Sequence, residues 1–195
     1  FYMEALAIVH PETNTPIGVL PRAQAIKEQA WCRSTNVFVM NHQGQILCHQ
    51  RSLQKERMPG VWSTHLGGHV GSDESYETNA LKELQEESGI VVDAAELISW
   101  RTTKLEHARL WVREYVVLVD EAAHTLVPQP GEVQQFAWMS ANDILQAAKA
   151  DTSWCAGTHD FMVEYHCLKA ALTVAHASGK LTSGVDLHTW HPIPA

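Results

Sequence analysis

A single predicted helix over residues 75–88 constrains this chain more than any other segment, because it combines an apolar stripe with concentrated negative charge. Ser75 is of the residue type that commonly begins helices, and Gly89 is typical of the left-handed residue that ends them. Apolar side chains recur every fourth position, at Tyr76, Ala80 and Leu84. That spacing aligns them on one helix face, so the sequence predicts a helix packed against a core.

Three glutamates, Glu83, Glu86 and Glu87, share one face of the same helix because they lie three and four positions apart. At about 100° per residue, Glu87 falls near Ala80 and Glu83 near Tyr76, so the carboxylates border the apolar stripe. A solvated acidic face is the simpler explanation. Like charges beside a buried stripe destabilise such a face, however, and desolvation makes the repulsion worse. A hard cation such as Mg²⁺, bound through carboxylate oxygens and substrate phosphates, would resolve that conflict.

The glutamates belong to a longer pattern that covers residues 68–90. A glycine, five residues, a glutamate and seven residues precede the run Lys-Glu-Leu-Gln-Glu-Glu-Ser-Gly-Ile. This pattern resembles the Nudix box, whose fixed positions correspond here to Gly68, Glu74, Lys82, Glu83, Glu86, Glu87 and Gly89. One position departs from the box, because Lys82 stands where the family has arginine. Lysine keeps the positive charge but lacks the two-pronged guanidinium that braces a neighbouring carboxylate.

The resemblance implies an α/β fold, the Nudix α/β/α sandwich with a mixed β-sheet, here with an N-terminal β-hairpin extension. We expect a single domain over residues 1–195, with the extension at 1–32, the box at 68–90 and an irregular tail at 178–195. Hydrophobic patterning and turn residues place the individual elements. The expected strands are 4–10, 17–20, 36–40, 45–50, 96–105, 110–119 and 136–139, and the expected helices are 75–88, 143–149 and 161–177.

The resemblance also implies a divalent metal site on the box helix. Glu83, Glu86 and Glu87 would hold Mg²⁺ or Mn²⁺ with the backbone carbonyl of Gly67, and Glu86 and Glu87 would be catalytic. The metal would neutralise a diphosphate and activate water for attack at phosphorus.

A further acid is expected from a later loop, as a metal ligand or as the base. Glu132 fits best, because it closes a proline-rich loop just before the strand 136–139. Glu106 and Glu121 are rival candidates, and an exposed loop glutamate is the simpler alternative.

The segment before the box carries Arg51-Ser52, Lys55, Pro59-Gly60 and Trp62, followed by residues 65–70. In these residues it resembles the Nudix subgroup that includes isopentenyl-diphosphate isomerase and its hydrolase relatives. Within this similarity Arg51 and Lys55 are candidate contacts to substrate phosphate, with surface or bracing roles as the alternative. Trp111 and Tyr115 offer rings for stacking on a base, although residues on a long strand more often belong to a core.

The isomerase activity itself requires residues that this chain lacks. The isomerase has a cysteine directly before a Gly-His pair, and Gly67 occupies that place ahead of Gly68 and His69. Its two further metal-binding histidines align with Ala25 and Cys32, and of its Glu-x-Glu pair only Glu114 is present. A lone His69 serves more often as a hydrogen-bonding brace than as a ligand. We therefore expect a pyrophosphohydrolase, with an isomerase-like enzyme or a non-catalytic ligand-binding Nudix module as alternatives.

The composition of this 195-residue chain, which is 45% hydrophobic, limits the classes of partner that it can bind. A net charge of −8 argues against binding a nucleic-acid polymer, but a metal can still bridge an acidic protein to a phosphorylated small molecule. No apolar stretch is long enough for a membrane span, and no signal-peptide pattern is present. Four cysteines without regular spacing are expected as reduced thiols in a cytoplasmic protein. The expected partner is a small diphosphate substrate, and a homodimer remains open.

Overall fold

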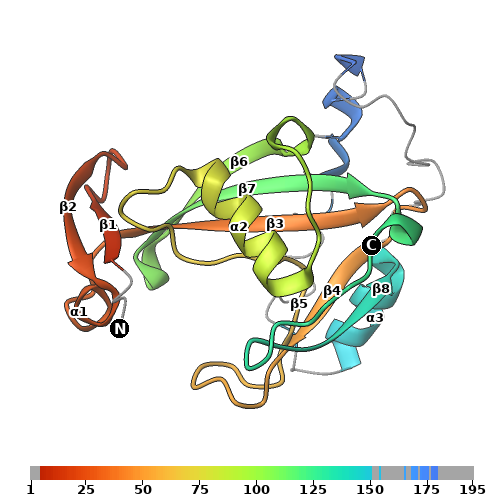
Figure 1. Cartoon of the computed structure of the whole chain (residues 1–195), viewed down its shortest axis with the longest axis horizontal. Coiled ribbons are helices and arrows are strands. Elements are labelled where there is room, and N and C mark those ends of the chain that lie inside the picture. Colours follow the sequence, from red (N-terminus) through yellow and green to blue (C-terminus); the bar gives the residue numbers. More distant parts are fainter. Residues whose placement is uncertain are drawn as a thin grey trace.

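The computed structural model describes residues 5–150, together with 154, 165, 168–170, 172–175 and 177–179. Its strands are β1 (Ala5–Val9), β2 (Pro16–Pro21), β3 (Cys32–Asn41), β4 (Ile46–Arg51), β5 (Trp62–Ser63), β6 (Ile98–Leu105), β7 (Leu110–Val119) and β8 (Val133–Met139). Its α-helices are α1 (Arg22–Lys27), α2 (Tyr76–Ser88) and α3 (Ala141–Ala150), and short 3₁₀ turns cover Ala94–Glu96, Glu106–Ala108 and Glu121–Ala123 (Figure 1). Among these residues, no helix has both the length and the apolar character needed to cross a membrane.

The described strands form one mixed sheet, and β3 lies at its centre (Figure 1). β3 runs parallel to β7 along its whole length, whereas the other named strand pairs are antiparallel. β1 and β2 continue the sheet on one side as a hairpin, and β4, β5 and β8 continue it on another. The mixed sheet expected from the sequence is therefore confirmed, and so is the N-terminal hairpin.

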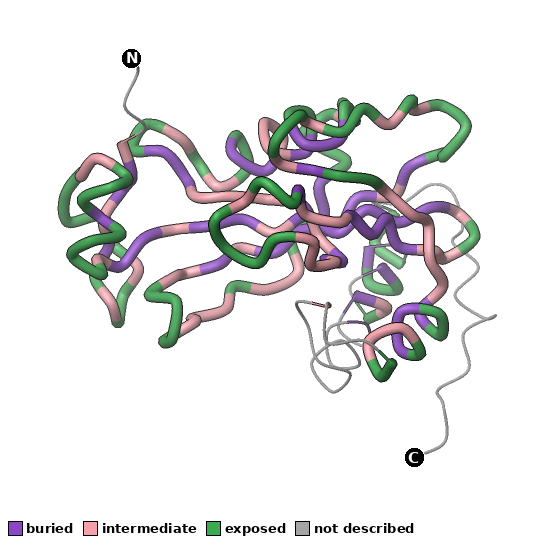
Figure 2. Tube along the Cα trace, turned by 90° about the horizontal axis from the view of Figure 1, so that it is seen from below, coloured by how far each residue is buried: buried purple, intermediate pink, exposed green. Residues whose placement is uncertain are grey.

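Two hydrophobic clusters, one on each face of the sheet, hold the helices in place. Alternate side chains of β3 point to opposite faces, so Val37 and Val39 meet Ala80 and Leu84 of α2. Phe38 and Met40 belong to the other cluster, with Ile144 and Leu145 of α3 and Leu168 and Leu172. Helices on both faces make the α/β/α sandwich that the box resemblance implies, and Figure 2 shows the buried strands running through its centre.

The helix α2 forms as its sequence predicts, because both ends are capped. The Ser75 hydroxyl accepts a hydrogen bond from the Thr78 amide at 3.0 Å, and Gly89 ends the helix with φ of 77°. That left-handed conformation is one that glycine adopts without strain.

Within the described residues, β2, β3 and β8 are longer than expected and β6 is shorter, and the short strand β5 and the helix α1 are additional. β3 begins four residues before the expected strand 36–40, because pairing with β7 extends it to Cys32. The helix α1 follows β2 directly and was not expected, since its six residues are too few for a clear periodic pattern. Residues 168–170 and 172–175 are helical, as expected for 161–177. The rest of that segment, apart from Tyr165 and Ala177, and most of the tail 178–195 lie outside the described residues.

Candidate active site

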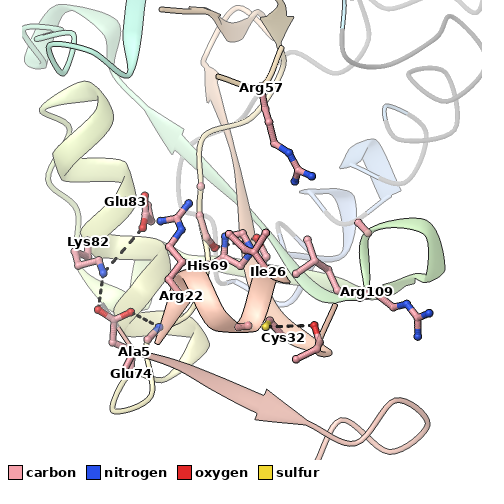
Figure 3. A pocket seen from close by; sticks show the side chains of 18 of the residues that line it. Ala5, Arg22, Ile26, Cys32, Arg57, His69, Glu74, Lys82, Glu83 and Arg109 are labelled. Atoms are coloured by element: carbon pink, nitrogen blue, oxygen red, sulfur yellow. Dashed lines mark hydrogen bonds and ion pairs between the residues drawn. The ribbon is translucent and has the colours of Figure 1, made fainter. Parts of the chain in front are cut away.

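A cavity of about 1100 Å³ lies beside α2 and collects side chains from segments far apart in the chain. One wall is the loop 67–74 with the glutamate face of α2, and another is α1 with the start of β3. Figure 3 shows Arg57 entering this space from the side opposite the helix α1. The cavity brings together nearly all the residues that the sequence singled out: Arg51, Lys55, Gly67, Glu83, Glu86, Glu87 and Glu132.

Three of the glutamates of α2, Glu83, Glu86 and Glu87, share one face of the helix but differ in their surroundings. Glu86 is exposed, Glu83 is mostly covered, and Glu87 is buried at 8% exposure. The Gly67 amide donates a hydrogen bond to Glu87 Oε2 at 3.0 Å. Burial nevertheless raises the pKa of Glu87 to about 8, and the nearby charges of Glu83 and Glu132 add to this effect. A buried carboxylate with one direct donor and like charges nearby is poised to bind a cation.

The two glycines before His69 allow the loop to approach both α2 and β3 closely. Gly67 has φ of 147°, and a Cβ atom added there would lie 2.0 Å from the Thr35 carbonyl oxygen. A Cβ added at Gly68 would lie 2.7 Å from Glu83 Oε1. Gly67 therefore has no room for a side chain while the loop keeps its path, and a side chain at Gly68 would displace the Glu83 carboxylate. The backbone of this turn is therefore part of the wall that the carboxylates face.

The opposite wall carries the expected basic residues and the expected loop acid. Lys55 Nζ and Glu132 Oε2 form an ion pair at 2.5 Å, and Arg51 and Glu132 are both close enough to Glu87 to influence its pKa. The rival Glu106 also lines the cavity, but it pairs with Lys104 at 2.6 Å. Glu121 does not line the cavity, and its carboxylate accepts a hydrogen bond from Asn41.

Glu74 and Lys82, the remaining polar residues of the box, brace the loop. Lys82 Nζ lies 2.6 Å from Glu74 Oε1 and 4.0 Å from Glu83 Oε1 (Figure 3). Burial alone would raise the pKa of Glu74. Donors from Lys82, the Gly71 amide and Asn79 outweigh that effect and hold its pKa below the usual range. The lysine at the arginine position therefore still supports the carboxylate that begins the box helix.

Sequence reasoning missed two contributors to this site. Asn79 is fully buried on α2 and bonds to three partners, but an isolated asparagine in a helix pattern carries no signal of that role. The other contributor is α1, whose Arg22 and Ile26 line the cavity wall.

The positions aligned with isomerase residues mostly meet in this cavity. Ala25, Cys32, Gly67 and His69 all line it, so the sequence alignment placed them consistently. Glu114 is instead buried at 3% exposure, in an ion pair with Arg101 and a hydrogen bond from Thr103.

The two aromatic residues considered for stacking have structural roles. The Trp111 indole donates to the Pro11 carbonyl at 3.0 Å, which ties β7 to the N-terminal hairpin. Tyr115 is 2% exposed in the core beneath α2.

The donor set suits a hard cation that keeps part of its water shell. Glu83, Glu86 and Glu87 offer carboxylate oxygens, which are the ligands that Mg²⁺ prefers. Within the described part of the chain, no three acidic, histidine or cysteine side chains converge as a ready-made metal cage. Mg²⁺ is usually held by one or two carboxylates together with waters and substrate phosphates, so this open arrangement fits it. Cys32 and Cys48 are buried thiols that form no disulfide within the described residues, while Cys155 and Cys167 fall outside them.

Comparisons with known proteins agree with this geometry. The family model described as NUDIX domain matches residues 31–156. The isopentenyl-diphosphate Delta-isomerase of Corynebacterium glutamicum is 24% identical over 164 residues, which cover 74% of this chain and 82% of that relative. An uncharacterised Nudix hydrolase of Pseudomonas aeruginosa is 37% identical over 79 residues, or 40% of this chain and 47% of the relative. A Deinococcus radiodurans protein of known structure shares the fold with a TM-score of 0.65 and 24% identity, covering 75% of this chain and 90% of that protein.

Proposed function

The chain belongs to the Nudix family, and on that premise we propose that it is a metal-dependent hydrolase that cleaves a diphosphate linkage in a small molecule. The substrate is nucleotide-like or another organic diphosphate. One observation carries the proposal: the glutamates of α2 face the same cavity as Arg51 and Lys55. Acidic and basic side chains around one space suit a substrate that brings its own negative charge together with a cation.

Each group in the cavity has a task in this reaction. Glu83, Glu86 and Glu87 supply oxygen ligands, and Arg51 and Lys55 contact phosphate oxygens through charge-assisted hydrogen bonds. A divalent cation held by these carboxylates would neutralise the diphosphate charge and would lower the pKa of the attacking water. The water oxygen bonds to phosphorus while the bridging P–O bond breaks, and the leaving phosphate takes that electron pair. A carboxylate, from Glu87 or Glu132, accepts the water proton.

Similarity to isopentenyl-diphosphate isomerases supports a second candidate function. An isomerase needs a group that donates a proton to a carbon atom, and the corresponding position here is Gly67. The close approach of Gly67 to the Thr35 carbonyl leaves no room for a cysteine side chain. Glu114, the acid that matches the isomerase pair, is engaged by Arg101. These features favour the hydrolase.

A screen of diphosphate compounds with Mg²⁺ or Mn²⁺ tests the proposal. Nucleoside diphosphates and triphosphates, nucleotide sugars, dinucleotides and isoprenoid diphosphates are incubated with the protein in ¹⁸O-labelled water, and products are identified by mass. We expect cleavage with one ¹⁸O atom in a phosphate product, abolished by excess chelator and restored by the metal. Turnover that persists in chelator contradicts the metal-dependent mechanism. Interconversion of isopentenyl and dimethylallyl diphosphate, absent from a Glu86→Gln variant, would support the isomerase instead.

A further inference from the structure

Asn79 stands out because it is a fully buried polar side chain with every polar atom engaged. Its Oδ1 accepts a hydrogen bond from the Thr35 hydroxyl at 2.6 Å. Its Nδ2 donates to the His69 carbonyl and to Glu74 Oε2, each at 3.0 Å. One amide therefore connects the central strand, the glycine loop and the carboxylate that precedes α2. A buried amide is retained at low cost only when its partners are all in place, so these contacts fix one another.

Glu74 is held at both of its oxygens by separate donors. Lys82 Nζ approaches Oε1 at 2.6 Å, while Asn79 Nδ2 and the Gly71 amide donate to Oε2 at 3.0 and 2.9 Å. Asn79 and Lys82 lie three positions apart on α2, so both reach the same side of the helix. A lysine presents one point of positive charge, whereas an arginine presents two parallel donors to a carboxylate. In this chain Asn79 supplies the second side-chain donor to Glu74, beside the Gly71 amide.

We propose that Asn79 and Lys82 together form a two-residue clamp that positions the loop 67–74 against the glutamate face of α2. Asn79 is thereby a positioning residue of the metal site. This inference rests on the proposed function.

The position of the loop matters because the loop is in direct contact with the glutamates. The Gly67 amide is the hydrogen-bond donor to Glu87, and the backbone of Gly68 packs against the Glu83 carboxylate. The clamp holds the loop at two points. One is the carbonyl of His69, the residue after Gly68, and the other is Glu74 at the end of the loop. Loosening these two points lets the glycine turn move relative to both carboxylates.

Metal binding without substrate tests the clamp directly. Mn²⁺ is titrated into the wild-type protein and Asn79→Ala, free Mn²⁺ is followed by electron paramagnetic resonance, and unfolding midpoints are measured in parallel. We expect Asn79→Ala to bind Mn²⁺ at least about 10-fold more weakly, the range seen when groups that orient metal ligands are removed. Asn142→Ala, the same change at an exposed position on α3, controls for the substitution and should bind normally. Affinity within about twofold of wild type for folded Asn79→Ala overturns the inference, whereas a wild-type protein that binds no Mn²⁺ either alone or with inorganic pyrophosphate added overturns the proposed function.

A double variant separates the clamp from a general packing role. If Lys82→Arg restores the second donor, removing Asn79 in that background should weaken Mn²⁺ binding by less than about threefold instead of about 10-fold. Lys82→Arg should not restore the stability that Asn79→Ala loses, because the arginine does not fill the space of the missing amide. Equal losses of Mn²⁺ affinity in both backgrounds contradict the clamp.

If Asn79→Ala does not fold, Thr35→Val tests the clamp instead. It removes the hydroxyl that donates to the Asn79 side-chain amide and keeps the shape of the side chain. We then expect Mn²⁺ binding about three- to 10-fold weaker than wild type. Unchanged Mn²⁺ binding by folded Thr35→Val overturns the clamp.

Discussion

The box helix has one carboxylate near each end, the half-buried Glu74 just before its first turn and the buried Glu87 in its last turn, and their surroundings are opposite. At its beginning, Glu74 receives hydrogen bonds from Lys82, the Gly71 amide and Asn79, and its pKa lies below the usual range. At its end, the Glu87 carboxylate receives, among the described residues, one hydrogen bond from the Gly67 amide, and burial beside Glu83 raises its pKa to about 8. Both residues belong to the same motif, yet one carboxylate is satisfied by the protein and the other is not.

This difference indicates separate tasks for the two glutamates. A carboxylate surrounded by donors is ionised without help and holds the structure around it in one arrangement. A buried carboxylate with few donors needs an external positive charge to ionise. We therefore assign Glu74 to the framework of the loop and Glu87 to the cation, and the following experiments test that division.

The largest expected effect is the loss of turnover in Glu87→Gln and in Glu86→Gln. Each change keeps the shape of the side chain but removes the charge that holds the metal, so we expect rates at least about 100-fold lower. Folding of Glu87→Gln should be nearly unchanged at neutral pH, because a protonated glutamate and a glutamine are similar in shape and polarity. Steady-state rates and unfolding midpoints check both statements, with Glu77→Gln, at an exposed glutamate of the same helix outside the cavity, as the matched control. A variant with near-normal turnover removes that residue from the catalytic set.

Gly67→Ala should damage the Glu87 end of the helix by displacing the loop. The added methyl group meets the Thr35 carbonyl, so the Gly67 amide moves away from Glu87 or the strand shifts. We expect a loss of unfolding free energy of about 2 kcal/mol or more, measured by urea unfolding. Gly18→Ala, at an exposed position with no atom within 4 Å of the added methyl, is the control. Native stability and turnover in Gly67→Ala would show that the turn does not depend on glycine.

The stability of the metal-free protein should fall as pH rises. Glu87 keeps its proton in the folded state up to about pH 8 but loses it near 4.5 when unfolded, so between these values the folded state binds the additional proton. This group then lowers the unfolding free energy by up to about 1.4 kcal/mol per pH unit. Saturating Mg²⁺ should flatten the slope, because the cation favours the ionised carboxylate.

Urea unfolding at several pH values, in chelator and in Mg²⁺, measures that slope. Glu87→Gln should lack this component, whereas Glu74→Gln should retain it, since Glu74 is ionised in both states over this range. The pKa of Glu74 is lowered on folding, so its own contribution to stability appears above its unfolded pKa and is lost as pH falls. If the unfolding free energy of Glu87→Gln still falls with pH at the same slope, another group causes the effect.

Glu74→Gln should lower the free energy of unfolding more than it lowers the rate of turnover. The ion pair with Lys82 is lost, and Gln keeps one oxygen acceptor where Glu74 has two, so we expect a loss of unfolding free energy of about 1–2 kcal/mol. Lys82→Met removes the same ion pair at its other partner and tests the same expectation. Stability unchanged in Glu74→Gln would contradict the framework role.

Glu132→Gln should have the smallest effect, a several-fold loss of turnover with little change in stability. Glu132 is partly exposed and already paired with Lys55, and exposed ion pairs contribute about 0–1 kcal/mol. Rates and unfolding midpoints of Glu132→Gln are compared with those of Glu106→Gln and Glu121→Gln. Full activity in Glu132→Gln together with loss in either rival assigns the accessory acid elsewhere.

Much of the fold could be predicted because its signals are local. Period-four apolar residues, a serine cap and a terminal glycine specify α2 without reference to distant segments, and turn residues mark the hairpins. The helix α1 could not be predicted, because six residues carry too little periodicity and its position depends on the hairpin before it. Glu132 lines the same cavity as the box glutamates, and its role as the accessory acid stays a prediction; its ion pair with Lys55 joins residues 77 positions apart and left no trace in sequence spacing.

The sequence by itself determined that Glu83, Glu86 and Glu87 share one helix face, because helical geometry depends only on their spacing. It also determined the family, since the box pattern is continuous along the chain. Only the tertiary structure decided which glutamates are satisfied and which are not. Glu87 meets an amide 20 positions away, and Asn79 is anchored by a hydroxyl 44 positions away. Desolvation and hydrogen bonding depend on neighbours that folding brings together, so the environment of each carboxylate was set by packing.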